Sequence, residues 1–166
     1  MENEYKEETQ NVYKRCRLRA AQYNEALSSR EKAAELLGIS PSSLANYELG
    51  ITKTVPVDMV VMMADLYNAP ELRNMYCKRE CPIGKFLSMA TDVKDLDNIT
   101  IRIMNSLDDD EIRGMKKSLL KIAEDGKISE DEKGDFNNIL EKLEDIASEV
   151  SELKILAEKL SKRMSR

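Results

Sequence analysis

The stretch Ser29–Gly50, SREKAAELLGISPSSLANYELG, decides the fold of the first half of the chain. Ser29 is a favourable N-cap, because its hydroxyl can accept a hydrogen bond from an unpaired amide of the first helical turn. A helix over residues 30–37 follows it, with apolar residues at helical spacing. Gly38 then stands where a left-handed residue ends such a helix. The pattern predicts one short helix with a defined start and a defined end.

A second short helix follows at once. Ser40 is another N-cap, and Pro41 occupies the first helical position, where its missing N–H is no loss. Leu44 and Tyr47 are spaced to face inward, and Gly50 closes the helix. Two short helices separated by a tight turn form a helix-turn-helix.

The order of these positions resembles the lambda-repressor/Cro (XRE-type) helix-turn-helix family of phage and bacterial regulators. The resemblance extends through PVDMVVMMADLYNAPEL and covers about residues 12–85. It implies an all-α protein with a five-helix DNA-binding domain, followed by a helical C-terminal region. The alternative is an ordinary helical hairpin inside an all-α protein. The residues that carry the resemblance are Ala34, Gly38, Ile39, Ser40, Leu44, Tyr47, Glu48 and Gly50, with Pro56 beyond.

Composition changes along the chain predict its organisation. An acidic, polar tail is expected to be disordered, and Pro82 and Gly84 mark a linker because both residues stop helices. The predicted segments are the tail at 1–11, the helix-turn-helix domain at 12–80 with the motif at about 30–49, the linker at 81–91, and a helical oligomerisation or interaction region at 92–166. Within the domain, a first helix is expected over residues 12–23 and a connector over residues 24–28.

Three helical patterns are expected in the last region. The acidic run at residues 108–111 suits the start of the second of them. The first two apolar stripes are Val93, Leu96, Ile99, Ile103 and Leu107, and then Ile112, Met115, Leu119, Ile122 and Ala123.

The third pattern is a long final helix. Ser129 and Glu132 are expected to form a capping box before it. Apolar residues at steps of three and four, with one extra three, favour a coiled coil that joins two copies of the chain. The alternative is a helix buried within its own subunit. The seam is Phe136, Leu140, Leu143, Ala147, Val150, Leu153, Ala157, Leu160 and Met164, with a neighbouring stripe of Ile139, Ile146 and Leu156.

By resemblance, the helix over residues 41–49 lies in the major groove of double-stranded DNA. Ser42, Ser43 and Asn46 point outward from it, and the cap Ser40 is expected to contact DNA with them. Asn46 is expected to pair with an adenine edge, and the serines to meet base or phosphate. The family often places Gln, Arg or Lys on this helix. Direct base readout is therefore expected to be weak, so that a pseudo-palindromic operator and DNA shape supply the rest.

Basic residues near the motif are the expected phosphate ligands. The resemblance places Arg30 on the DNA backbone, and Thr52 and Lys53 follow the second helix. Residues 12–53 hold seven Lys/Arg and four Asp/Glu, a net charge of +3, although the whole chain carries −5. This local excess suits phosphate binding but is modest.

Three arginines of the expected first helix are further candidates. Arg15 and Arg19 are expected to add phosphate contacts, as is Arg17, unless one of the three pairs instead with Glu48, which has a structural role in the family. The pattern alone leaves open which arginine does so.

Catalytic and cofactor chemistry is not indicated. The chain has no His, which excludes His-based triads and His metal sites, and no glycine-rich phosphate loop. Residues 125–132 resemble half of an EF-hand loop, but Lys121 and Ala123 occupy the earlier ligand positions. We expect no enzyme activity, no metal and no cofactor. With no apolar membrane span or signal pattern, a cytoplasmic location is expected.

Two other functions remain open. The acidic half from residue 86, with fourteen Lys/Arg against nineteen Asp/Glu, is a possible surface for a protein partner, as in an antirepressor or antitoxin-like protein. In that case the helix-turn-helix binds protein and not DNA. Alternatively, Cys77 and Cys81 form a redox- or metal-responsive switch, although with Cys16 alone they cannot complete a four-ligand zinc site in one chain.

Overall fold

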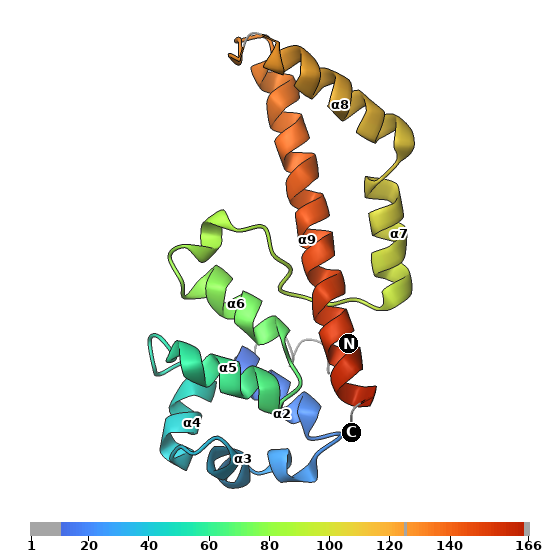
Figure 1. Ribbon diagram of the computed structural model, residues 1–166. Helices are drawn as coiled ribbons and strands as arrows, with labels where there is room; N and C mark the ends of the chain where they lie inside the picture. Colours follow the sequence, from blue (N-terminus) through green and yellow to red (C-terminus); the bar gives the residue numbers. More distant parts are fainter. Residues whose placement is uncertain (1–10, 125, 165–166) are drawn as a thin grey trace, which may run out of the picture. The chain divides into compact units, whose positions relative to one another are not determined.

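The computed structural model describes residues 11–124 and 126–164, except for the side chain of Arg163. These residues form helices, turns and loops but no strand, which confirms the predicted all-α class (Figure 1). Residues 1–10 of the tail predicted at 1–11, and Asp125 of the EF-hand-like motif, lie outside the described residues. Asn11 does not fit the prediction of disorder, because its side chain accepts the Tyr13 N–H at 2.9 Å. The described residues divide into two compact units, one of residues 11–85 together with 159–164, and one within residues 86–158.

The first unit contains the helix-turn-helix. Ser29 caps α3 by accepting the Lys32 N–H at 3.3 Å, and Ser40 caps α4 by accepting the Ser43 N–H at 3.0 Å. Gly38 has a φ of +68°, the left-handed conformation predicted for it. Up to Arg79, the helices of this unit are α2 (Val12–Ala20), the 3₁₀ turn η1 (Glu25–Ser28), α3 (Arg30–Leu36), α4 (Pro41–Glu48), α5 (Val57–Leu66) and α6 (Glu71–Arg79).

The start of the chain differs from the prediction in two places. The first helix ends at Ala20, three residues before the predicted end at Tyr23. The connector after it is the 3₁₀ turn η1, which begins because the Asn24 side chain accepts the Ala26 N–H at 3.2 Å. This turn carries Leu27 into the core, where only 1% of it is exposed.

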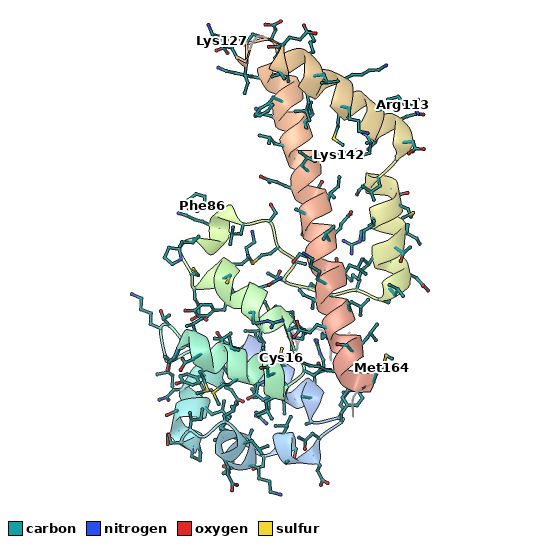
Figure 2. The ribbon with its side chains drawn as sticks, in the orientation of Figure 1. Cys16, Phe86, Arg113, Lys127, Lys142 and Met164 are labelled. Atoms are coloured by element: carbon teal, nitrogen blue, oxygen red, sulfur yellow. The ribbon has the colours of Figure 1, made fainter. Side chains whose placement is uncertain are left out.

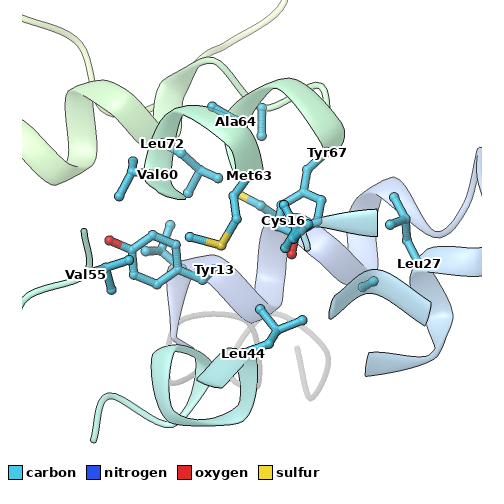
Figure 3. Packing of buried hydrophobic residues seen from close by; sticks show 14 of the residues in the cluster. Tyr13, Cys16, Leu27, Leu44, Val55, Val60, Met63, Ala64, Tyr67 and Leu72 are labelled. Atoms are coloured by element: carbon cyan, nitrogen blue, oxygen red, sulfur yellow. The ribbon is translucent and has the colours of Figure 1, made fainter. Parts of the chain in front are cut away.

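One hydrophobic core joins these helices (Figure 3). Figure 3 shows Leu44 of α4 pointing toward Met63 of α5, with Tyr13 of α2 beside them. Tyr47, predicted to face inward, packs against this core but stays half-buried. The buried members are Val12, Tyr13, Cys16, Leu27, Ala33, Ala34, Leu37, Leu44, Val55, Val60, Met63, Ala64, Tyr67, Ala69, Leu72 and Met75.

The second unit is built on the long final helix. Its helices are α7 (Leu96–Ser106), α8 (Asp109–Ala123) and the part of α9 (Lys133–Met164) before residue 159, and a short turn, η2 (Gly84–Phe86), precedes them. Asp95 caps α7, which therefore starts three residues after the beginning of the predicted stripe. Asp108 accepts the N–H groups of Asp110 and Glu111, as expected for an acidic helix start.

Polar contacts tie the helices of this unit together. The buried carboxylate of Glu152 on α9 accepts the Lys94 N–H at 2.7 Å and pairs with Arg102 of α7. Lys142, which projects from α9 in Figure 2, pairs with Glu111 of α8. These contacts fix one side of α9 against α7 and α8.

The capping box before α9 is only half formed. Glu132 accepts the Ser129 N–H at 3.1 Å, as a capping box requires. The Ser129 hydroxyl, however, donates to the same carboxylate at 2.5 Å instead of accepting a backbone N–H. The regular helix consequently begins at Lys133.

Within the described residues, every helix is too short or too polar to cross a membrane.

Candidate nucleic-acid interface

Helix α4 is anchored on one side and open on the other. Leu44 and Glu48, one turn apart, are buried, with 0% and 2% of each residue exposed. Ser42 and Asn46 are also one turn apart and are exposed. Ser43 is half-buried, and its Oγ lies 2.9 Å from Oγ of Ser40. The exposed side of α4 therefore presents one amide and small hydroxyl groups.

A buried ion cluster holds the end of α4. The Glu48 carboxylate accepts Nε and Nη2 of Arg17 at 2.5 and 3.1 Å, which is a bidentate pair. Arg17 also donates to the carbonyls of Leu27 and Ser28 at 2.7 and 3.1 Å. Among the three arginines of α2, Arg17 is therefore the partner of Glu48, and it joins α2, η1 and α4.

Arg30 is the second cation on Glu48. Its Nε lies 3.0 Å from Oε2 of Glu48, and 33% of its side chain is exposed. Arg17, Arg30 and Glu48 together carry one excess positive charge beside α4. Arg30, predicted to bind phosphate, thus also contacts the end of α4.

The loop after α4 carries Thr52, which is half-buried, and Lys53, which is exposed. At its start, the amides of Ile51 and Thr52 donate to the Asn46 carbonyl at 2.9 and 3.4 Å. At its end, the Val55 N–H donates to Oε2 of Glu80 at 2.9 Å. Both ends of this loop are therefore tied to helices.

Glu80 itself is held by Tyr13. The Tyr13 hydroxyl donates to Oε1 of Glu80 at 2.7 Å. Burial, and then the hydrogen bond and charge of Glu80, raise the pKa of Tyr13 well above its ordinary range, so the hydroxyl keeps its proton as donor.

The two remaining arginines of α2 lie elsewhere. Nη1 of Arg19 lies 3.6 Å from Oε1 of Glu71 on α6. Arg19 follows Arg17 by two residues, so its side chain leaves α2 about 200° around the helix axis from that of Arg17. Arg15 is half-buried on the same helix. The structure thus brings Arg30, Thr52 and Lys53 together with α4, but it does not bring Arg19 to them.

Three contacts in this region were missed by the sequence reasoning. The helical pattern did not identify Arg17 as the partner of Glu48, and Glu80 carries no local signal. Asn11 was detectable, because Asn directly before a helix is an N-cap signal. Its side chain accepts the Tyr13 N–H at 2.9 Å and donates to the Tyr47 carbonyl at 3.0 Å, which links α2 to α4.

Metal binding would need a cluster of ligating side chains. Within the residues that the structure describes, no group of three or more His, Cys, Asp or Glu side chains is placed to hold a metal ion. Cys77 and Cys81 are free thiols and half-buried, and Cys16 is free and buried. Burial raises the pKa of the Cys16 thiol to about 11, which makes it unreactive at neutral pH.

Comparison with protein families matches residues 24–72 to a family described as Helix-turn-helix. The match runs from the start of η1 into α6, so it includes α3, α4 and α5 but not α2. Comparisons with curated proteins and with solved structures gave no match. The matched family is one of DNA-binding regulators and not of enzymes, which supports a DNA-binding regulatory role. Residues 24–72 of this chain therefore form a helix-turn-helix domain of the XRE type, as the resemblance implied.

Proposed function

We propose that the chain is a sequence-specific transcriptional regulator that binds DNA as a homodimer, with α4 of each copy in the major groove of a pseudo-palindromic operator. The observation that carries the proposal is the division of α4. Leu44 and Glu48 anchor it, while Ser42 and Asn46 are exposed on the side a groove would meet. Helices of this motif bind with the N-terminal residues of the second helix at base edges.

Asn46 is the main base-reading residue in this proposal. Its amide can form two hydrogen bonds with an adenine edge, and such a pair contributes about 1–3 kcal/mol of discrimination. Ser42 and Ser43 offer only hydroxyl groups to base or phosphate. One amide on each copy is too little for a selective site, so two half-sites and the shape of the DNA must add to it.

Phosphate binding is assigned to the residues around α4. Arg30 has a partly exposed guanidinium, and Lys53 is exposed on a loop anchored at both ends. Thr52 precedes it, and the cap Ser40 lies at the α4 N-terminus, which favours an anion. Arg15 and Arg19 of α2 remain weaker candidates. Arg19 pairs with Glu71 of α6, and Arg15 is half-buried.

The homodimer is supported by the apolar seam of α9. Within the second unit, Ile139 and Ile155 are buried, whereas Leu143 and Val150 are 45% and 41% exposed. One side of the helix therefore packs inside the unit, and the predicted coiled-coil side is open. A second copy is the proposed cover, since heptad spacing pairs such seams.

The test is selection of bound fragments from random DNA by the full-length protein. The proposal predicts enrichment of a two-fold symmetric sequence, and binding that weakens in Arg30→Ala and Asn46→Ala proteins. Absence of any enriched sequence, together with stable capture of a protein partner by residues 92–166, would support the protein-binding alternative instead.

A further inference from the structure

Glu80 occupies a junction of three elements. It follows the last residue of α6, and its two carboxylate oxygens have different partners. One oxygen accepts the Tyr13 hydroxyl of α2 at 2.7 Å, and the other accepts the Val55 N–H at 2.9 Å. Val55 itself is 2% exposed, so without Glu80 its amide would lose its acceptor in a buried place.

This junction holds one end of the loop that carries Lys53. The start of the loop is fixed by the amides of Ile51 and Thr52 on the carbonyl of Asn46. The end is fixed by Glu80 through Val55, two residues after Lys53. Lys53, between these anchors, is exposed. Its side chain can meet a phosphate at one defined place only while both anchors hold.

We infer that Glu80 is a positioning residue for DNA binding, which holds the loop so that Lys53 contacts a phosphate although Glu80 never touches DNA. The inference rests on the proposed function. The sign of its charge makes the claim distinctive. A carboxylate near DNA repels phosphates, so its removal should strengthen binding unless it positions a ligand.

Two substitutions separate position from charge. Glu80→Ala removes the charge and both hydrogen bonds. Glu80→Gln removes the charge, but its Oε1 can still accept the Val55 N–H, and its Nε2 can donate to the Tyr13 hydroxyl. If Glu80 acts by position, Gln behaves as wild type and Ala does not. If it acts by charge, the two variants behave alike.

The readout is the salt dependence of binding to the duplex recovered by selection, between about 50 and 200 mM salt, because each phosphate contact adds about 0.9 to the slope. In wild type and in Glu80→Gln, Lys53→Ala removes one phosphate contact from each copy of the proposed dimer, so it should lower the slope by about 1.8. In Glu80→Ala the slope should already be lower by this amount, and Lys53→Ala should lower it no further. A loss of stability alone would not change which contacts contribute to the slope.

Several results would overturn the inference. One is a slope that Lys53→Ala lowers equally in the wild-type and Glu80→Ala backgrounds. Another is DNA affinity that increases equally in Glu80→Ala and Glu80→Gln. If Glu80→Ala does not fold, Tyr13→Phe is the second variant, because it frees one oxygen of the Glu80 carboxylate. In the Tyr13→Phe background, Lys53→Ala should lower the slope less than it does in wild type. An equal decrease in the two backgrounds contradicts the inference. Failure of the wild-type protein to bind any duplex refutes the proposed function as well, whereas the other outcomes leave it intact.

Discussion

Arg30 and Glu48 are joined by a hydrogen bond of 3.0 Å between Nε and Oε2, which ties the first residue of α3 to the last residue of α4. Arg17 of α2 donates to both oxygens of the same carboxylate. Arg30, which is expected to bind phosphate, thus also supports α4. Weaker DNA binding in an Arg30 variant therefore needs a separate measurement of stability, and the two arginines allow that comparison.

Arg17→Met should destabilise the protein far more than Arg30→Met. The Arg17 and Glu48 side chains are 4% and 0% exposed, and breaking such a buried pair costs about 3–5 kcal/mol. Arg30 is one-third exposed, so its removal should cost about 1 kcal/mol or less. Urea unfolding of the two variants measures the difference. Equal losses would mean that Arg17 is not the main support of Glu48.

Ser40 and Ser42 should separate structure from recognition. Ser40→Ala removes the α4 cap and should lower the free energy of unfolding by about 1 kcal/mol. Ser42 is exposed, and Ser42→Ala should leave stability within about 0.5 kcal/mol while it weakens operator binding. Thermal unfolding and fluorescence anisotropy with the selected duplex check both. A Ser42→Ala protein with unchanged DNA affinity would remove this serine from the interface.

Stability should fall at alkaline pH through Cys16. Burial raises the pKa of its thiol from the ordinary 9.0 to about 11, so the unfolded chain releases the proton first. The contribution is fully present below pH 9 and is lost as the pH rises toward 11. From about pH 8 to about pH 10, the stability of wild type relative to Cys16→Ala should fall by about 1.4 kcal/mol. A pH-independent difference would show that the folded thiol titrates normally.

Leu143→Glu should convert the proposed dimer to a monomer without unfolding the chain. Leu143 is 45% exposed on α9, so a charge there is tolerated in one chain but not in an apolar seam between two. Ile139, at 5% exposure, provides the contrast: Ile139→Glu should unfold the second unit. Sedimentation velocity and circular dichroism measure both effects. A Leu143→Glu protein that still dimerises would place the dimer contact elsewhere.

The helix-turn-helix was predictable because its signals are local. Serine caps act within three residues, and Gly38 and Gly50 have φ values of +68° and +70°, which glycine adopts without strain. Each of these positions fixes its element without knowledge of the rest of the chain. The predicted capping of α3 and α4 is accordingly confirmed.

The contacts that support the site were less predictable because they join distant residues. Glu80 meets Val55 across 25 positions and Tyr13 across 67, and no spacing rule links such pairs. The orientation of Arg19 depends in the same way on where α6 places Glu71. Periodicity showed that α9 has a wide apolar face, but burial alone distinguishes Ile139 from Leu143.

The central claim is that α4 reads DNA through Asn46. Its most direct test is equilibrium binding of wild-type and Asn46→Ala proteins to the selected duplex and to duplexes in which each A·T pair is changed in turn. The account predicts that wild type loses about 1–3 kcal/mol at one adenine in each half-site, and that Asn46→Ala no longer distinguishes that base. A variant that retains the full base preference of wild type would contradict it.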